Sequence, residues 1–192
     1  MARSKEFDPD AALQRALELF WERGYEATSM ADLVERLGIA RASLYATFGG
    51  KRELYLQTLH RYVRSRDPAV LDALSQPGPV LPAVRALIRT YAAESSGDDR
   101  RGCMVVNAAV ELAPRDEAAA AFVEASWSHL ETVLTSALTR ARAQGELSED
   151  KDPRALARML LVFMQGMRVL GRTSGGAARL DDAAEQALAV LG

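Results

Sequence analysis

The sequence predicts an all-α protein of about nine helices. Alanine, the strongest helix former, supplies 34 of the 192 residues. Apolar residues recur at helical spacing along nearly the whole chain, and no stretch alternates apolar and polar residues as a half-buried strand does. With 48% apolar and 26% charged residues, the composition is that of a globular protein and excludes disordered, collagenous and disulfide-rich classes.

The first two helices have clear start and stop signals. The first begins after Asp8, an N-cap that is followed by proline in the first turn, and Gly24 ends it. Ser29 and Asp32 form a capping-box pattern at the start of the second helix, which ends at Gly38.

Seven further helices are predicted. A third covers about residues 41–47, and a fourth runs from about residue 51 to about residue 66. Beyond a break rich in proline at residues 75–79, the others are expected at about residues 82–94, 103–112, 116–144, 153–170 and 181–191. The chain therefore divides into a domain of residues 1–66 and a second domain of residues 67–192.

Composition also indicates the compartment. The single cysteine, Cys103, cannot form an internal disulfide. The longest uninterrupted apolar run, residues 159–164, is far shorter than the ~20 residues that span a membrane. The N-terminal residues have no apolar segment typical of a secretory signal. We expect a cytoplasmic protein with no membrane partner.

Two short helices joined by a three-residue turn are the pattern of a helix-turn-helix, and residues 38–40 provide such a turn. The second helix of such a pair lies in the major groove of DNA, where residues near its N-terminus meet base edges. The apolar side chains expected to fix the helix crossing are Leu33, Leu37, Ile39, Leu44 and Phe48. The side chains left on the outer face are Arg41, Ala42, Ser43, Tyr45 and Thr47.

The charge distribution agrees with DNA binding in sign but does not establish it. Residues 1–66 carry 11 basic and 9 acidic side chains, a net charge of +2. Residues 67–192 carry 13 and 17, a net charge of −4. The N-terminal third is therefore the mildly basic part of an acidic chain.

Several fixed spacings then occur together in one segment. They are Gly24-Tyr25-x-x-Thr28-Ser29-Met30-x-Asp32-Leu33, Leu37-Gly38-Ile39, Leu44-Tyr45-x-x-Phe48 and Lys51-x-x-Leu54. In these positions the chain resembles the DNA-binding domain of the TetR/AcrR family of bacterial transcriptional regulators, over about residues 6–60. It departs from the family at Gly49-Gly50 and at Ala46-Thr47, where other residues are common.

The resemblance implies roles for individual side chains. The residues implied to contact phosphates are Thr28 and Ser29 at the start of the second helix, with Tyr45, Thr47 and Lys51. The start of the third helix, Arg41, Ala42 and Ser43, would meet base edges, with Arg41 and Ser43 as the candidates for direct base contacts. Arg3 and Lys5 form a short basic arm that would reach a neighbouring groove.

Three of these assignments have alternatives. Tyr45 is also a residue type that packs half-buried on a domain surface. Arg41 can contact phosphate alone. The arm of Arg3 and Lys5 can instead be disordered.

The resemblance also implies a second helical domain that dimerises and usually holds a small-molecule pocket. Within it, residues 101–109 are similar to a Gly-Cys-x-x-x-Asn segment of one branch of the family. Aromatic, methionine and cysteine side chains suit a pocket for varied ligands. The candidates are Tyr91, Cys103, Met104, Phe122, Trp127, Phe163, Met164 and Met167, each of which is also an ordinary core residue type.

Two side chains in this domain have two interpretations each. Cys103 is either a reactive thiol activated by Arg100 and Arg101 or a small buried hydrophobe. His129 is either a polar anchor of the pocket or a surface histidine. Two histidines and one cysteine make no metal set, and no catalytic constellation or phosphate-binding glycine loop occurs. We expect no metal, no cofactor and no enzymatic activity.

Together these observations favour a homodimeric repressor that binds a palindromic operator. Its release would follow binding of a small-molecule ligand or thiol stress, with the helix of about residues 51–66 linking the domains. Gly166 would allow close approach of helices across the two-fold axis. The alternatives are a helical small-molecule carrier with a vestigial helix-turn-helix and a transcriptional activator. The operator, the ligand and the regulated genes are not specified by the sequence.

Overall fold

The structure, a computed structural model, describes residues 7–97, 99–173 and 177–192. Within these ranges it contains nine α-helices, one short 3₁₀ helix and no strand, which confirms the predicted fold class. The helices are α1 (Pro9–Arg23), α2 (Met30–Leu37), α3 (Arg41–Phe48), α4 (Lys51–Ser75), α5 (Leu81–Ser96), α6 (Met104–Glu111), η1 (Ala113–Arg115), α7 (Glu117–Ala143), α8 (Pro153–Leu170) and α9 (Ala177–Ala189).

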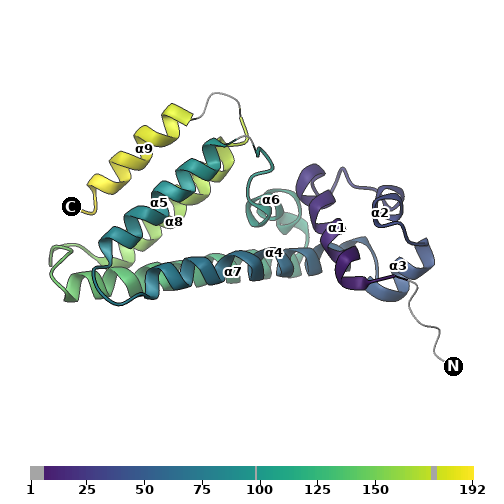
Figure 1. Cartoon of the computed structure of the whole chain (residues 1–192), viewed down its shortest axis with the longest axis horizontal. Helices are drawn as coiled ribbons and strands as arrows, with labels where there is room; N and C mark the ends of the chain where they lie inside the picture. The colour runs from purple at the N-terminus through teal and green to yellow at the C-terminus, as the bar shows by residue number, and fades with distance from the viewer. Residues whose placement is uncertain (1–6, 98, 174–176) are drawn as a thin grey trace.

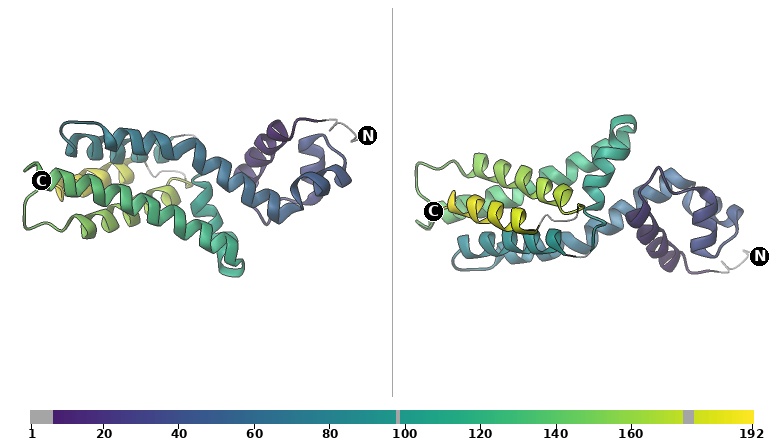
Figure 2. Two further views of the ribbon diagram at one scale, coloured as in Figure 1. Left: turned by 90° about the horizontal axis from the view of Figure 1, so that it is seen from below. Right: turned by 90° about the horizontal axis from the view of Figure 1, so that it is seen from above.

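The molecule is elongated, with the N-terminal helices at one end. Figure 1 shows α1, α2 and α3 grouped at this end and α5, α8 and α9 packed at the other, while α4 and α7 run along the length between them. The views from below and above in Figure 2 show the same division. In the described ranges no helix combines the length and the hydropathy needed to cross a membrane.

The predicted helix caps are present. The Asp8 carboxylate accepts a hydrogen bond from the Asp10 N–H at 2.9 Å and begins α1. The Ser29 hydroxyl accepts from the Asp32 N–H at 3.1 Å, and the Asp32 carboxylate accepts from the Ser29 N–H at 2.8 Å. This reciprocal pair is the predicted capping box of α2.

The fourth helix is longer than predicted. We expected it to end at about Arg66, but α4 continues through Pro68 to Ser75. Proline removes one backbone donor from a helix, yet the helix continues because its last turns bury Leu74 and pack Val70 against the C-terminal core. The expected boundary between residues 66 and 67 therefore lies inside a continuous helix.

The structure has two hydrophobic cores. The second joins the end of α4 with α5, α8, α9 and most of α7. The first joins α1, α2, α3 and the N-terminal half of α4 with α6 and the start of α7. Its buried members from the second predicted domain are Met104, Val105, Ala108, Leu112, Ala119 and Val123. The helix-turn-helix core is thus completed by residues far along the chain.

Polar contacts hold α6 against the N-terminal helices as well. The indole N–H of Trp21 donates to the carbonyl of Gly102 at 2.8 Å, just before α6 begins. At the other end of α6, the Glu111 carboxylate accepts from the backbone N–H of Tyr25 at 2.7 Å. Both ends of α6 are therefore tied to the segment that contains α1 and the α1–α2 loop.

Candidate nucleic-acid interface and ligand cavity

The crossing of α2 and α3 is set by a tight turn. Gly38 adopts the left-handed conformation (φ 67°, ψ 32°), which glycine adopts without the strain of a side chain. Its N–H donates to the Val34 carbonyl at 3.0 Å and closes α2. The five apolar residues predicted to fix the crossing are all buried: Leu33, Leu37, Ile39, Leu44 and Phe48. This packing holds α3 with its opposite face outward.

Helix α3 carries five of the ten predicted DNA-binding residues. Arg41, Ala42 and Tyr45 are exposed, while Ser43 and Thr47 are half-buried. The Arg41 guanidinium lies 5.9 Å from the centroid of the Tyr45 ring. Unlike α2, the helix has no side-chain cap at its start, so its first N–H groups remain open to an incoming acceptor.

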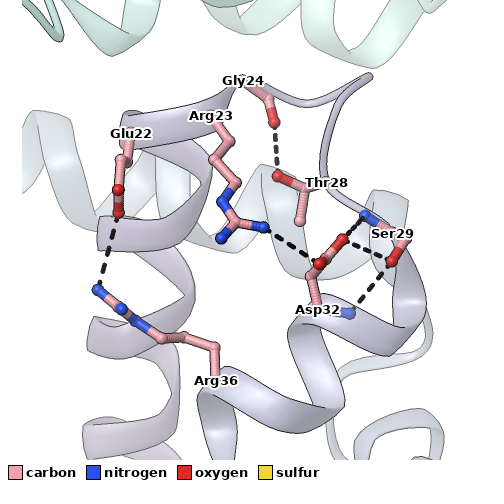
Figure 3. Close-up of polar contacts among 7 residues, drawn as sticks. All are labelled: Glu22, Arg23, Gly24, Thr28, Ser29, Asp32 and Arg36. Atoms are coloured by element: carbon pink, nitrogen blue, oxygen red, sulfur yellow. Dashed lines mark hydrogen bonds and ion pairs between the residues drawn. The ribbon is translucent and has the colours of Figure 1, made fainter.

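The side chains at the start of α2 are engaged within the protein. Thr28 is fully buried, and its hydroxyl donates to the Gly24 carbonyl at 2.7 Å and stabilises the α1–α2 loop (Figure 3). Ser29 is exposed, but its hydroxyl is engaged by Asp32. Hydrogen bonds from Ser29, followed in effect by the charge of Arg23, lower the pKa of Asp32. The first turn of α2 therefore already holds a carboxylate.

Lys51 opens α4 close to this surface. Its ammonium lies 4.3 Å from the centroid of the Tyr25 ring and is half-buried. Arg3 and Lys5, the predicted basic arm, lie outside the described residues.

A cavity of about 590 Å³ lies among the helices that follow the helix-turn-helix. It is bounded by α4, α5, α7 and α8 and by the start of α6. Its volume falls in the range of small-molecule sites. Three of the eight candidate ligand residues line it, Tyr91, Cys103 and Trp127, and His129 joins them.

The other five candidates do not line this cavity. Met104 and Phe122 belong to the first core, where Phe122 packs edge-on against His60. Met164 and Met167 are buried in the second core, with Phe163 packed against it. The reason is helical phase: the side of α8 that faces the cavity presents Gln165 and Arg168, and the methionines lie on other sides of the helix.

The cavity also contains charged residues that the sequence patterns did not single out. A nitrogen of Arg168 donates to the Glu94 carboxylate at 2.6 Å, and a nitrogen of Arg66 lies 3.5 Å from the same oxygen. Arg66, Glu94 and Arg168 come from three different helices, so only the tertiary packing brings them together. No local sequence signal marks such a cluster.

Burial shapes the chemistry of the cavity. It raises the pKa of Tyr62 and of Tyr91 above the ordinary tyrosine value, which already lies well above neutral pH, so both hydroxyls are protonated. Burial alone would lower the pKa of Arg168, but the hydrogen bond to Glu94 holds it above the ordinary value. The indole N–H of Trp127 is buried and has no hydrogen-bond partner among the described residues. The described part of the chain contains no group of His, Cys, Asp and Glu that could hold a metal ion.

Comparisons with known proteins agree with this architecture. The family model of the bacterial regulatory proteins of the tetR family matches residues 12–58. The model of the tetracyclin repressor-like C-terminal domain matches residues 80–187. The chain is 38% identical over 193 residues to the uncharacterized HTH-type transcriptional regulator YezE of Bacillus subtilis, with both chains fully covered.

Two further relatives have assigned roles. The chain is 33% identical over 186 residues to the HTH-type transcriptional repressor ComR of Escherichia coli, an alignment covering 93% of this chain and 86% of ComR. It also superposes, with a TM-score of 0.87, 32% identity and full coverage of both chains, on a cysteine mutant of the TetR family regulator CifR complexed with 26-base-pair double-strand operator DNA. The chain therefore belongs to the TetR family of bacterial regulatory proteins and is a DNA-binding helix-turn-helix transcriptional regulator.

Proposed function

We propose that this protein is a homodimeric repressor that binds a palindromic operator and releases it when the cavity is occupied or Cys103 is modified. The observation that carries the proposal is the position of α6. Cys103 and Val105, at its start, line the cavity, while Glu111, at its end, holds the α1–α2 loop of the DNA-binding helices. A change at the cavity wall therefore acts on an element that contacts the helix-turn-helix directly.

Release requires a ligand that prefers one conformation. A ligand shifts the balance between DNA-bound and DNA-free conformations only by its difference in affinity for the two. A coupling of about 1–3 kcal/mol, typical of such systems, weakens operator binding roughly 5- to 150-fold. Besides α6, the continuous helix α4 connects the cavity with the DNA-binding helices. It lines the cavity at Arg66 and begins at Lys51, beside α3, the helix proposed to read DNA.

Repression is the direction favoured by the relatives. ComR, which aligns along nearly the whole chain, is a repressor, and a cysteine mutant of CifR is complexed with operator DNA. An activator is the alternative, because FasR of Mycolicibacterium smegmatis is named an activator, although its match covers 31% of this chain.

The proposed dimer interface is formed by α8 and α9. Val162 and Val169 of α8 are 73% and 50% exposed, and Val190, just after α9, is 44% exposed. Val162, Gly166 and Val169 recur at helical spacing on one side of α8, and a β-carbon on Gly166 would meet no atom within 4 Å. The α3 helices of the two subunits, about 34–36 Å apart, would then read the two halves of a palindrome.

Replacing Val162 with glutamate is expected to dissociate this dimer, because it buries a carboxylate in an apolar interface. Light scattering after gel filtration should give the mass of a monomer, and affinity for the operator should fall. Val110→Glu is the matched control, since Val110 is 70% exposed but lies on α6. A Val162→Glu protein that keeps the mass of a dimer would contradict the assigned interface.

The function itself is tested by selection from a random DNA duplex library at two salt concentrations. We expect enrichment of a palindrome, with affinity that falls as salt rises. Binding that ignores sequence and vanishes with salt would contradict a specific regulator and favour a carrier. A reporter gene placed behind the selected site then separates repression from activation.

A further inference from the structure

Two tyrosines, two arginines and one glutamate that line the cavity lie on neighbouring turns of α4, α5 and α8, and they define its polar end. Because α4 and α5 are joined by a short loop and run antiparallel, Tyr62 and Arg66 of α4 lie beside Tyr91 and Glu94 of α5. Arg168 of α8 pairs with the same glutamate. This polar end lies toward the DNA-binding helices, since Arg66 also stacks on Trp21 of α1, 5.3 Å from its ring centroid.

Besides five polar residues, Ser65, Thr90, Ser126, His129 and Gln165, the rest of the cavity lining is apolar. Most of it comes from the later turns of α4, the first turns of α5 and the middle of α7. The residues are Ala69, Val70, Leu71, Ala73, Ala83, Ala86, Leu87, Leu130 and Val133. These small and branched side chains offer no hydrogen bond to a ligand, so this part of the cavity suits a hydrocarbon body.

Arginines outnumber carboxylates in the lining of the polar end, and Asp99, which interacts with the charge of Arg66 from outside the lining, is itself paired with Arg101. Two guanidinium groups share the single carboxylate of Glu94, and no other described acidic side chain lines the cavity. Arg168 is the more enclosed of the two, with a side chain only 10% exposed and a guanidinium 4.2 Å from the Tyr91 ring centroid. A guanidinium has five N–H donors, so a single carboxylate leaves donors of both arginines unused.

We propose that the cavity binds an amphipathic anion, with a carboxylate or similar oxyanion head at Arg66 and Arg168 and an aliphatic body between α4, α5 and α7. The inference rests on the proposed function in taking this cavity as the regulatory site. The head supplies the acceptor that the paired arginines lack, and the neutral hydroxyls of Tyr62 and Tyr91 add donors. An amine head would instead face two cations and a carboxylate that is already paired.

The same geometry indicates how the head acts. It competes with Glu94 for Arg66, which stacks on Trp21 and on Tyr62 at 5.0 Å. Engagement of Arg66 by the ligand therefore changes a contact between α4 and α1. Occupied and empty cavities differ in this way at the boundary with the DNA-binding helices.

The test compares head groups on one body. Octanoate, octanol and octylamine are titrated into the DNA-free protein and followed by tryptophan fluorescence, because Trp127 lines the cavity. Straight-chain carboxylates from butanoate to dodecanoate then define the body length. We expect octanoate to bind at least about tenfold more tightly than octanol, and octylamine to bind more weakly than both. Equal binding of the three, binding of none, or preference for the amine would overturn the proposal.

Charge variants separate binding from folding. Arg168→Met and Arg66→Met are each expected to weaken octanoate binding about tenfold or more while leaving octanol binding nearly unchanged. Glu94→Gln removes the competing carboxylate and is expected to tighten octanoate binding several-fold, an effect that a merely structural role would not produce. Arg64→Met, on α4 but outside the cavity, is the matched control and should not change either affinity.

The proposed function fails separately. Operator selection uses the protein without ligand. A protein that selects a specific operator but does not bind octanoate would therefore support the regulator and contradict only the ligand class. Tight octanoate binding that does not release DNA would support the ligand class and contradict induced release. An unchanged preference for octanoate in Arg168→Met and Arg66→Met would overturn the assignment of the head site.

Discussion

Replacing Arg41 with alanine is expected to remove most of the sequence preference of DNA binding while leaving general DNA affinity largely intact. Arg41 is exposed at the first position of α3, whose open N-terminus faces outward. A guanidinium paired with guanine contributes about 1–3 kcal/mol of discrimination at each half-site. Two half-sites double this, so preference for the operator over an unrelated duplex should fall roughly 30-fold to 10⁴-fold.

The measurement is fluorescence anisotropy with the selected operator and a scrambled duplex at two salt concentrations. Lys51→Ala is the contrasting variant, because an ammonium that pairs with a phosphate acts on every sequence. It should weaken binding to both duplexes and reduce the salt slope by about one per subunit. If Arg41→Ala instead weakens both duplexes equally, Arg41 is a phosphate contact, and the base contacts belong elsewhere on α3.

Replacing Gly24 with alanine is expected to destabilise the fold strongly. Gly24 has φ +87° and ψ 169°, a region that is essentially restricted to glycine and costs another residue about 1–3 kcal/mol. A β-carbon there would also lie 2.5 Å from a carboxylate oxygen of Glu111, and moving that side chain aside breaks its hydrogen bond from the Tyr25 N–H, at a cost of about 1–3 kcal/mol. The free energy of unfolding should fall by about 2–6 kcal/mol, and the Tm by roughly 4–24 °C.

A double-mutant cycle assigns the cause. Glu111→Ala alone leaves the Tyr25 N–H without its acceptor and should cost about 1–3 kcal/mol. The double variant should cost less than the sum, since the second change removes the atom that the first one meets. Gly38→Ala is the control, because Gly38 also has a positive φ but open space around a β-carbon. Equal losses for Gly24→Ala and Gly38→Ala would exclude the clash with Glu111.

Local signals in the sequence predicted local structure well. The N-cap at Asp8, the capping box of Ser29 and the glycine turn at Gly38 each depend on a few neighbouring residues, and each is present. The apolar stripe of the helix-turn-helix was likewise predicted as the buried face, because helical spacing alone determines which residues share a side.

Tertiary arrangements were predicted less well. Helical phase shows that Met164 and Met167 are buried, but it does not show which neighbouring helix they meet, and they face the core beside the cavity. The hydroxyl of Thr28 bonds the Gly24 carbonyl within the α1–α2 loop, a partner that the sequence spacing did not indicate. The cluster of Arg66, Glu94 and Arg168 joins three helices, so no window along the chain contains its signal.

The composition of the first core limits how the protein can be recombined with its relatives. Residues 104–123 supply buried side chains to the core of the helix-turn-helix, and α4 crosses the expected domain boundary without a break. A chimera joined after residue 66 would therefore cut a helix and pair the DNA-binding helices with an α6 from another protein. There are two ways to exchange operator specificity between regulators of this architecture. Either the exposed face of α3 is transplanted alone, or α6 is moved together with the DNA-binding helices.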